Sequence, residues 1–462
     1  MRIVLFRLTA LFCLAACLAV VPMGASGPGS SGVAWAQDDD DGGGDDDDDD
    51  DGGITAQSGR DDNSAAPPRR VTRKVVAPRR QAPVRPQPEF VPEIVVLGLA
   101  ADDLTILLQE GFVVLEARSL VSLDADLIRL QPPADLELPS ARERIRLLAS
   151  GANADFNHLY RTTEDAIPAS SAVGSQHEPR RNCSHANCAA HDLVEWPEKT
   201  WREQHCPMIV PQIGIIDTGV NTDHDLIENG NLEVIRLNPD RTDPSSAVHG
   251  TAIVSVFAGK PDTRVEGLLP EGRYVVVDVF TNVKGDERAD AFSLVRGLDL
   301  LASRQIRIVN LSLSGPENAT LASGIADLLD QRDMIFLAAV GNSGPDKDVA
   351  FPAAYDGVIG VTAIDRRGRI YRSAQRGAEV DLAAPGSGLL LATSVSGAKE
   401  KTGTSFAVPF ATAAAALALA ADPTLSGDAV QAMLTGTARD LGEAGQDHVF
   451  GHGVLQAAML CP

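Results

Sequence analysis

Short apolar runs alternate with segments of helical spacing along the C-terminal half of the chain. The apolar runs are rich in β-branched residues, as is typical of parallel strands buried on both faces. They are MIVPQIGIID, RYVVVDVF, IRIVNLSLS, MIFLAAVGN and VIGVTAID. Two segments between them, DAFSLVRGLDLLASR and TLASGIADLLDQR, carry apolar positions at helical spacing. This alternation predicts an α/β domain over residues 208–462, with a parallel sheet covered by helices on both faces.

A second, smaller pattern occupies residues 93–161. Its segments read in order as strand, helix, strand, strand, helix and strand. They are EIVVLGL, DDLTILLQEG, FVVLEARSL, DADLIRLQ, SARERIRLLASG and ADFNHLY. This order is that of a split βαβ unit, so we expect a small α+β domain of ferredoxin-like type. The segment contains no catalytic group of residues.

The segments that flank the smaller domain have a different composition. Residues 37–92 combine an Asp-rich tract with a Pro- and Arg-rich stretch. Neither part has the apolar content to offset the entropic cost of ordering, so we expect a disordered linker there. Residues 162–207 contain proline and cysteine and are expected to connect the two predicted domains.

The net charge of the chain limits its partners. The formal charge is −23, and eleven aspartates in two runs between residues 38 and 51 supply about half of it. Without these aspartates the chain still carries −12. An acidic folded part repels a phosphate backbone, so this charge argues against a nucleic-acid partner.

The N-terminal residues have the features of an export signal. Arg2 and Arg7 precede an apolar run, and a small-x-small site ends at Ala36. We therefore expect residues 1–36 to be a cleaved signal peptide. A competing interpretation is lipid attachment at Cys17, because LAAC resembles a bacterial lipoprotein box. Either processed form leaves the cytoplasm, as a secreted or periplasmic protein or as a membrane-anchored lipoprotein.

Four cysteines remain after removal of residues 1–36. They are Cys183, Cys188, Cys206 and Cys461. An even number of cysteines in an oxidising compartment favours disulfides. Of the three pairings, the simplest joins Cys183 to Cys188 and Cys206 to Cys461.

A metal site is the alternative use of the first two cysteines. Cys183, His185, Cys188 and His191 have the ligand types of a zinc site. Their spacing matches no standard zinc finger, and exported cysteines usually pair. The metal question stays open at this point.

Candidate catalytic residues stand at the ends of the predicted strands, where α/β sheets bind their ligands. Asp217 follows the run IGII, His249 opens the helix-like HGTAIVSVFAG, and Ser405 lies in GTSFAVP. A buried carboxylate can orient an imidazole that takes the proton of a serine, and the serine can then attack an acyl carbon. Asn342, in AAVGNSGP, is a candidate donor to the oxyanion, together with the backbone N–H of Ser405.

Four motifs in one order carry a family resemblance. DTG, HGT, GNSG and GTSxAxP resemble those of the subtilisin-like (S8) serine peptidases, across residues 208–462. Taken alone, GTSFAVP would read as a helix N-cap. The resemblance implies that Asp217 is the triad acid, His249 the general base, Ser405 the nucleophile and Asn342 the oxyanion donor.

The resemblance also implies a substrate-lining stretch and an inhibitor. The stretch consists of Asn310, Leu311, Ser312, Leu313, Ser314 and Gly315. The domain at 93–161 resembles the inhibitory propeptide of these peptidases, an inhibitor-I9-like fold that covers the cleft with its final strand. The chemistry requires no cofactor, and no clear match to the calcium-loop sequence of the family is present, so calcium binding stays an open expectation.

Two functions follow from this sequence. The first is an exported serine endopeptidase, made as a zymogen, that hydrolyses peptide bonds in proteins or peptides through an acyl-enzyme on Ser405. Its own prodomain would be an intramolecular inhibitor. The alternative is a secreted binding or scaffold protein that keeps the peptidase fold and is held inactive by its prodomain.

Overall fold

The structure is a computed structural model that describes residues 89–162, 183–206, 210–239 and 243–460. These residues belong to one compact unit, Gln81–Pro462. Several expectations lie outside the described residues: the signal peptide 1–36, Cys17, most of the linker 37–92, part of the connector and Cys461.

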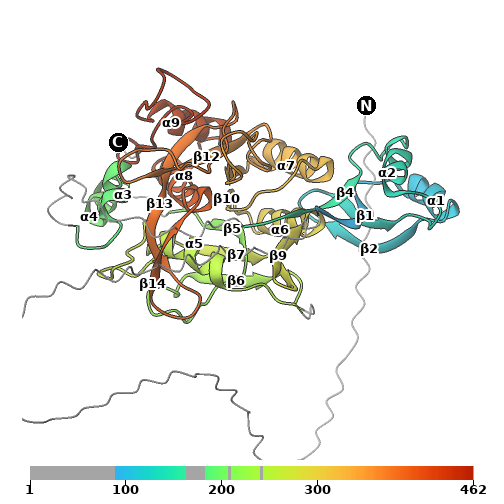
Figure 1. Ribbon diagram of the computed structural model, residues 1–462, viewed down its shortest axis with the longest axis horizontal. Coiled ribbons are helices and arrows are strands. Elements are labelled where there is room, and N and C mark those ends of the chain that lie inside the picture. Colours follow the sequence, from blue (N-terminus) through green and yellow to red (C-terminus); the bar gives the residue numbers. More distant parts are fainter. Residues whose placement is uncertain (1–88, 163–182, 207–209, 240–242, 461–462) are drawn as a thin grey trace, which may run out of the picture. The chain divides into compact units, whose positions relative to one another are not determined.

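Eight strands of the described residues form the main sheet, in the order β14-β13-β12-β11-β10-β5-β7-β6 (Figure 1). They are β5 (Ile213–Asp217), β6 (Leu232–Arg236), β7 (Tyr274–Asp278), β10 (Ile308–Leu311), β11 (Ile335–Ala339), β12 (Val358–Asp365), β13 (Leu382–Ala392) and β14 (Ala398–Thr402). All neighbours pair in parallel except β13 and β14, which are antiparallel. Each of the five predicted strand runs contains one of these strands.

Helices cover both faces of this sheet. They include α5 (Val248–Ala258), α6 (Ala291–Ser303), α7 (Ala319–Arg332), α8 (Val408–Ala421) and α9 (Gly427–Gly436), with the short α3 (Cys188–Leu193) and α4 (Lys199–His205). Successive side chains of β11 point to opposite faces: Ile335 and Leu337 pack in the cluster of α5 and α8, whereas Phe336 and Ala338 pack in the cluster of α6 and α7. The α/β prediction is therefore confirmed.

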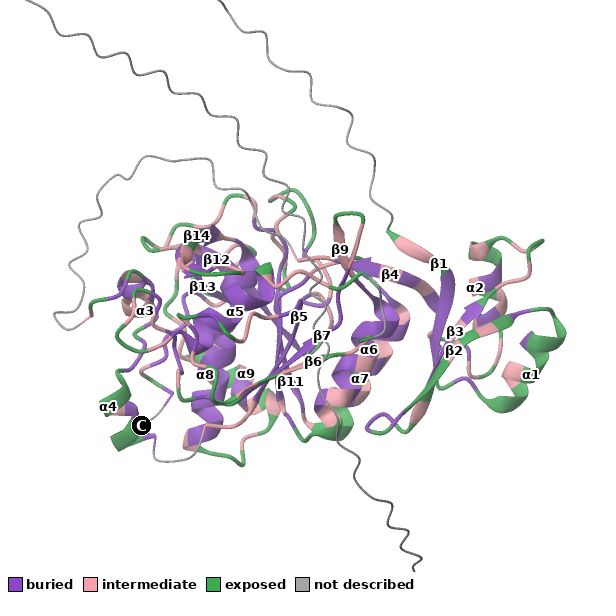
Figure 2. Ribbon diagram, turned by 90° about the horizontal axis from the view of Figure 1, so that it is seen from below, coloured by how far each residue is buried: buried purple, intermediate pink, exposed green. Residues whose placement is uncertain are grey.

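The helix α8 is the central core helix of one face. Together with the 3-10 turn η1 (Thr404–Phe406) it forms an apolar segment, Thr404–Ala421, of which 94% of an 18-residue window is buried. Among the described helices, this segment alone has the length and composition to cross a membrane. Figure 2 shows α5 and α8 buried along their length. Its burial inside the fold identifies it as a core helix.

The small domain has the predicted order of elements. They are β1 (Phe90–Leu97), α1 (Ala101–Gln109), β2 (Val113–Leu120), β3 (Ala125–Gln131), α2 (Leu138–Arg146) and β4 (Asp155–Tyr160). The strands align as β2-β3-β1-β4, and each neighbouring pair is antiparallel. Ile94, Val96, Leu107 and Ile145 belong to a core of its own between sheet and helices. The ferredoxin-like prediction is therefore confirmed.

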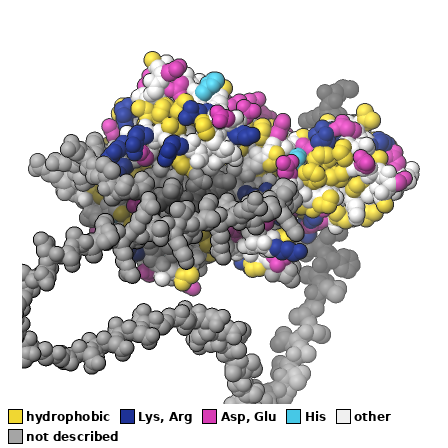
Figure 3. All heavy atoms as spheres, in the orientation of Figure 1, with side chains coloured by type: hydrophobic (Ala, Val, Ile, Leu, Met, Phe, Trp, Pro, Cys, Tyr) yellow, Lys and Arg dark blue, Asp and Glu magenta, His cyan; other side chains and the backbone are white. Residues whose placement is uncertain are grey.

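The two faces of the small domain differ. On the sheet face, Val95, Leu97 and Leu127 are buried in the same cluster as the side chains of α6 and α7. On other parts of its surface, apolar side chains remain exposed and gather in the space-filling view (Figure 3). They include Ile106, Leu108, Val113, Leu115 and Leu147. The domain is therefore packed on α6 and α7 through its sheet.

Polar contacts fix the small domain on the same two helices. The carboxylate of Asp299 in α6 accepts three backbone N–H bonds from residues 121–123, at 3.2, 2.7 and 3.2 Å. The carboxylate of Asp155 accepts the N–H of Ala319 at 2.9 Å. That N–H belongs to the first residue of α7, where a negative charge is favourable. Thr320 adds a hydrogen bond from its hydroxyl to the carbonyl of Val95 at 3.0 Å.

Candidate active site

Asp217 and His249 form a buried hydrogen-bonded pair. Asp217 is the last residue of β5, His249 lies in the first turn of α5, and both are nearly inaccessible to solvent. Nδ1 of His249 lies 2.8 Å from Oδ1 and 3.0 Å from Oδ2 of Asp217. The N–H of Thr218 donates to the same carboxylate at 2.7 Å. A carboxylate held against Nδ1 keeps the proton on that nitrogen and leaves Nε2 as the basic atom.

The glycine of the HGT motif lets α5 approach the turn after β5. A Cβ on Gly250 would lie 2.5 Å from the carbonyl oxygen of Gly219 and 2.6 Å from that of Thr218. The N–H of Gly250 donates to the hydroxyl of Thr218 at 2.9 Å. A larger residue would push the start of the helix away from the strand end, and His249 would move with it.

Ser405 lies in the turn η1 at the start of the helical segment, and the end of β10 anchors this turn. Its hydroxyl donates to the carbonyl of Ser312 at 3.1 Å, and the hydroxyl of Ser312 donates to the carbonyl of Ser405 at 2.8 Å. The ring of Phe406, the next residue, lies 5.5 Å from the ring of His249 between centroids. The structure therefore brings Asp217 and His249 into direct contact and places the η1 turn, through Phe406, next to the histidine ring.

The side-chain amide of Asn342 has a fixed orientation. Its Oδ1 accepts the N–H of Thr404 at 3.0 Å and the hydroxyl of Thr404 at 2.8 Å. Because the amide group is planar, the contacts that hold Oδ1 at Thr404 also fix the direction of the donating Nδ2. Thr404 directly precedes Ser405, so one turn carries both the serine and the residue that orients Asn342. Sequence reasoning did not identify Thr404, because its contact with Asn342 joins residues 62 positions apart in sequence.

The predicted substrate-lining stretch divides into an inner and an outer part. Asn310, Leu311, Ser312 and Leu313 are all buried. Nδ2 of Asn310 donates to the hydroxyl of Ser312 at 2.8 Å, which extends the anchor of the Ser405 turn. Ser314 instead pairs with Arg161, directly after β4, and Gly315 lies against the ring of Tyr160, the last residue of β4, so these two residues form the outer part.

A hairpin that the sequence did not reveal forms the other edge of this region. It consists of β8 (Thr281–Val283) and β9 (Asp286–Asp290). In β9, Asp290 and Ala289 pair antiparallel with Leu159 and Tyr160 of β4. Because DERAD has no apolar alternation, its pattern gives no strand signal.

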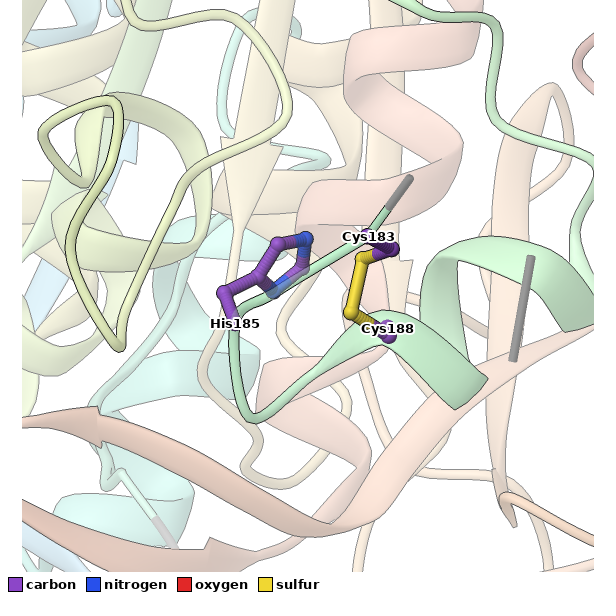
Figure 4. Close-up of side chains that lie close together, drawn as sticks. All are labelled: Cys183, His185 and Cys188. Atoms are coloured by element: carbon purple, nitrogen blue, oxygen red, sulfur yellow. A yellow bond between two sulfur atoms is a disulfide. The ribbon is translucent and has the colours of Figure 1, made fainter. Parts of the chain in front are cut away.

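The cysteine cluster is a disulfide with a neighbouring histidine. Cys183 is bonded to Cys188, and ligand atoms of these residues and His185 lie within 4.8 Å of one another (Figure 4). Sulfurs in a disulfide are not the thiolates that bind metal ions. Nδ1 of His185 accepts the N–H of Asn187 at 3.2 Å, and burial lowers the pKa of this histidine. The contacts indicate a structural cross-link.

Of the two cysteines in the second predicted disulfide, only Cys206 lies within the described residues. Cys206 is disulfide-bonded. Cys461, its expected partner, lies outside the described residues. The prediction that Cys206 pairs with Cys461 therefore stays a prediction.

Comparisons with known proteins match the C-terminal half of the chain to one family. The sequence pattern of the subtilase family matches residues 211–453. Subtilisin DY of Bacillus licheniformis is 30% identical over 249 residues, which are 53% of this chain and 88% of that protein. The minor extracellular protease Epr of Bacillus subtilis is 28% identical over 247 residues, 53% of this chain and 37% of Epr, so the match spans about a third of that relative's length.

A solved structure shares the fold. The crystal structure of fervidolysin from Fervidobacterium pennivorans, a keratinolytic enzyme related to subtilisin, aligns with a TM-score of 0.67 at 18% identity. The alignment covers 82% of this chain and 62% of fervidolysin. At this identity the likeness concerns the fold alone. It extends beyond the 53% of the chain that the sequence relatives match.

The family match covers slightly more than half of the chain and includes every residue of the candidate site. Asp217, His249, Asn342 and Ser405 all lie within residues 211–453. The chain belongs to the subtilase family of subtilisin-like serine endopeptidases.

Proposed function

We propose that the chain is an exported serine endopeptidase in which Ser405 is the nucleophile, His249 the general base and Asp217 the residue that orients the base. The observation that carries this proposal is the buried 2.8 Å contact between Asp217 and His249, beside the turn that holds Ser405. A carboxylate and an imidazole in this arrangement activate a serine hydroxyl for attack on an acyl carbon.

The reaction begins when Oγ of Ser405 attacks the peptide carbonyl carbon and its proton passes to Nε2 of His249. The carbonyl oxygen becomes an oxyanion, which accepts hydrogen bonds from Nδ2 of Asn342 and the backbone N–H of Ser405. Because Thr404 holds Oδ1 of Asn342, the amide needs no reorientation as the charge develops. The C–N bond then breaks, and the proton on His249 moves to the departing amine.

The second half of the reaction releases the acyl group. A water molecule gives its proton to Nε2 of His249 and attacks the acyl carbon of the Ser405 ester. A second oxyanion forms and is bound by the same two donors. The ester C–O bond breaks, the proton returns to Oγ of Ser405, and the free enzyme is restored. No metal ion or organic cofactor takes part in these steps.

The small domain would be the propeptide that blocks the cleft before maturation. Three observations support this role. Its last strand pairs with β9, Arg161 pairs with Ser314 through two backbone hydrogen bonds, and the ring of Tyr160 lies over Gly315. A peptide chain in this position would exclude a substrate from the same strands. Maturation would then cut the connector, and the enzyme would leave the cytoplasm by the signal at 1–36 or with a lipid at Cys17.

Hydrolysis by matched variants tests the proposal. Denatured casein is incubated with the full chain, its Ser405→Ala variant and a control, Asp330→Asn, which changes an exposed residue of α7. We expect the wild type and Asp330→Asn to generate new termini inside casein, and we expect Ser405→Ala to generate none. Equal hydrolysis by the wild type and Ser405→Ala would contradict the assignment of the nucleophile. A folded wild type with no hydrolysis, even after its small domain is removed, would favour the binding or scaffold alternative.

A further inference from the structure

The chain leaves β4 as an extended segment held by the catalytic domain on both sides. Tyr160 pairs antiparallel with Ala289 of β9. On the other side, the N–H of Arg161 donates to the carbonyl of Ser314 at 2.9 Å, and the N–H of Ser314 donates to the carbonyl of Arg161 at 3.0 Å. These are main-chain contacts, which any extended peptide can make. Selection among peptides therefore depends on the groups that meet the side chains.

The Tyr160 side chain fills one such position. It is fully buried, and a Cβ on Gly315 would lie 2.5 Å from its Cδ1 atom. Its hydroxyl donates to the carbonyl of Pro316 at 2.9 Å. The absence of a side chain at Gly315 makes the space for the ring, so this position accepts a large aromatic group.

The Arg161 side chain meets a carboxylate with matching geometry. Its Nε donates to Oδ1 of Asp286 at 2.8 Å, and its Nη2 donates to Oδ2 at 3.0 Å. The two side chains are 22% and 15% exposed, so water has limited access to the pair. The hydrogen bond from Arg161 is the main cause of the lowered pKa of Asp286. The carboxylate is therefore ionised at neutral pH, so both of its oxygens can accept hydrogen bonds from the guanidinium in a bidentate contact.

Asp286 also has a fixed position before any substrate arrives. Nη1 of Arg288, on the same strand β9, donates to its Oδ2 at 2.8 Å. This contact leaves the two-oxygen edge available to the guanidinium of Arg161. A planar guanidinium matches that edge with two parallel N–H bonds, whereas a lysine ammonium offers a single point of charge.

We propose that Asp286 is a specificity-determining residue, which selects an arginine at the substrate position whose main chain pairs with Ser314. The substrate class is an extended peptide with this arginine directly after an aromatic residue, as in the Tyr160–Arg161 pair of the chain itself. The inference rests on the proposed function, because it takes the segment after β4 to occupy the cleft that substrates use. A substrate that replaces this segment meets Gly315 and Asp286 in the same places.

Peptides that copy residues 155–166 of the chain provide the test. Three internally quenched versions carry arginine, lysine or alanine at the position of Arg161, and the full chain is assayed for kcat/KM on each. We expect the arginine peptide to exceed the alanine peptide about tenfold, which is the ratio for about 1.4 kcal/mol from a partly exposed bidentate pair. The lysine peptide should fall between them.

Variants of the enzyme test whether Asp286 causes the preference for arginine. Asp286→Asn should reduce the arginine-to-alanine ratio to within about twofold of one, and Asp330→Asn should keep it. Because the readout is a ratio within one preparation, a partly misfolded variant does not change it. A wild-type ratio near one, or a ratio that survives in Asp286→Asn, would overturn the inference and leave the peptidase proposal intact. No hydrolysis of any peptide or of casein by the wild type would overturn both.

Discussion

Removal of the Tyr160 ring should loosen the small domain from the subtilase domain, because the ring lies against Gly315. The perturbation is Tyr160→Ala in a chain that also carries Ser405→Ala, so that no self-cleavage interferes. An aromatic side chain buries roughly 150–250 Å², which at about 25 cal/mol per Å² corresponds to roughly 4–6 kcal/mol. Because the small domain itself covers part of the ring, we expect a loss of about 3 kcal/mol, at the lower end of aromatic-to-alanine substitutions.

Hydrogen exchange measures this loss where it occurs. Opening of the β4 contact exposes the N–H groups of Arg161 and Ser314, which bond to each other's carbonyls. A loss of about 3 kcal/mol should accelerate exchange of a peptide that covers Ser314 by about 10²-fold. Peptides from α5 and β12 serve as internal controls and should be unchanged.

A matched variant separates the ring from its hydroxyl. Tyr160→Phe keeps the ring and loses only the hydrogen bond to the carbonyl of Pro316, which contributes about 0.5–1.5 kcal/mol. Its exchange should therefore accelerate by about tenfold or less. Gly315→Ala should resemble Tyr160→Ala, because the new Cβ would overlap the ring. Unchanged exchange in Tyr160→Ala, or equal effects of Tyr160→Ala and Tyr160→Phe, would refute the reasoning.

Three further predictions concern catalysis, pH and packing. Asn342→Ala should lower kcat about 10²–10³-fold with little change in KM, which is the magnitude known for loss of an oxyanion donor in subtilisin. Steady-state kinetics would measure this change, and an unchanged kcat would show that Asn342 is not an oxyanion donor. Burial lowers the pKa of His158, aided by Arg142 and opposed by Asp155 and Glu89, and Asn318 donates to its Nδ1 at 3.0 Å. The folded chain therefore binds this proton less readily than the unfolded chain, so the contribution of His158 to stability is full above the ordinary value of 6.5 and is lost as pH falls below it. Chemical denaturation as a function of pH would show this trend, which should flatten in His158→Gln. Gly250→Ala should destabilise the chain by about 1–3 kcal/mol in chemical denaturation, because the new Cβ would lie 2.5 Å from a carbonyl oxygen; unchanged stability would contradict the packing argument.

Some residues of the candidate site could be predicted from the sequence, and others could not. Asp217, His249 and Ser405 each stand in a local motif next to an apolar run, because strand ends and helix starts impose their own residue types. Thr404 lies beside Ser405, yet its role depends on the approach of Asn342, which is 62 positions away in sequence. That approach is a tertiary contact and leaves no local pattern.

The hairpin of β8 and β9 was likewise not predictable from the sequence. The strand β9 has the sequence DERAD, which lacks the alternation of a half-buried strand. It forms a strand because its backbone pairs with β4 and β8, and β4 lies more than 120 residues earlier in the chain. The ferredoxin-like order of the small domain was predictable because its strands and helices follow one another locally with clear periodicity.

Location of a serine-directed label tests the central assignment most directly. The full chain, in a preparation that hydrolyses casein, is treated with a fluorophosphonate and analysed by peptide mass spectrometry beside Ser405→Ala. The account predicts one adduct per chain on Ser405, loss of hydrolysis in proportion to labelling, and no adduct in Ser405→Ala. Hydrolysis that is lost while the adduct lies on another residue, or that persists when Ser405 is fully labelled, would contradict it.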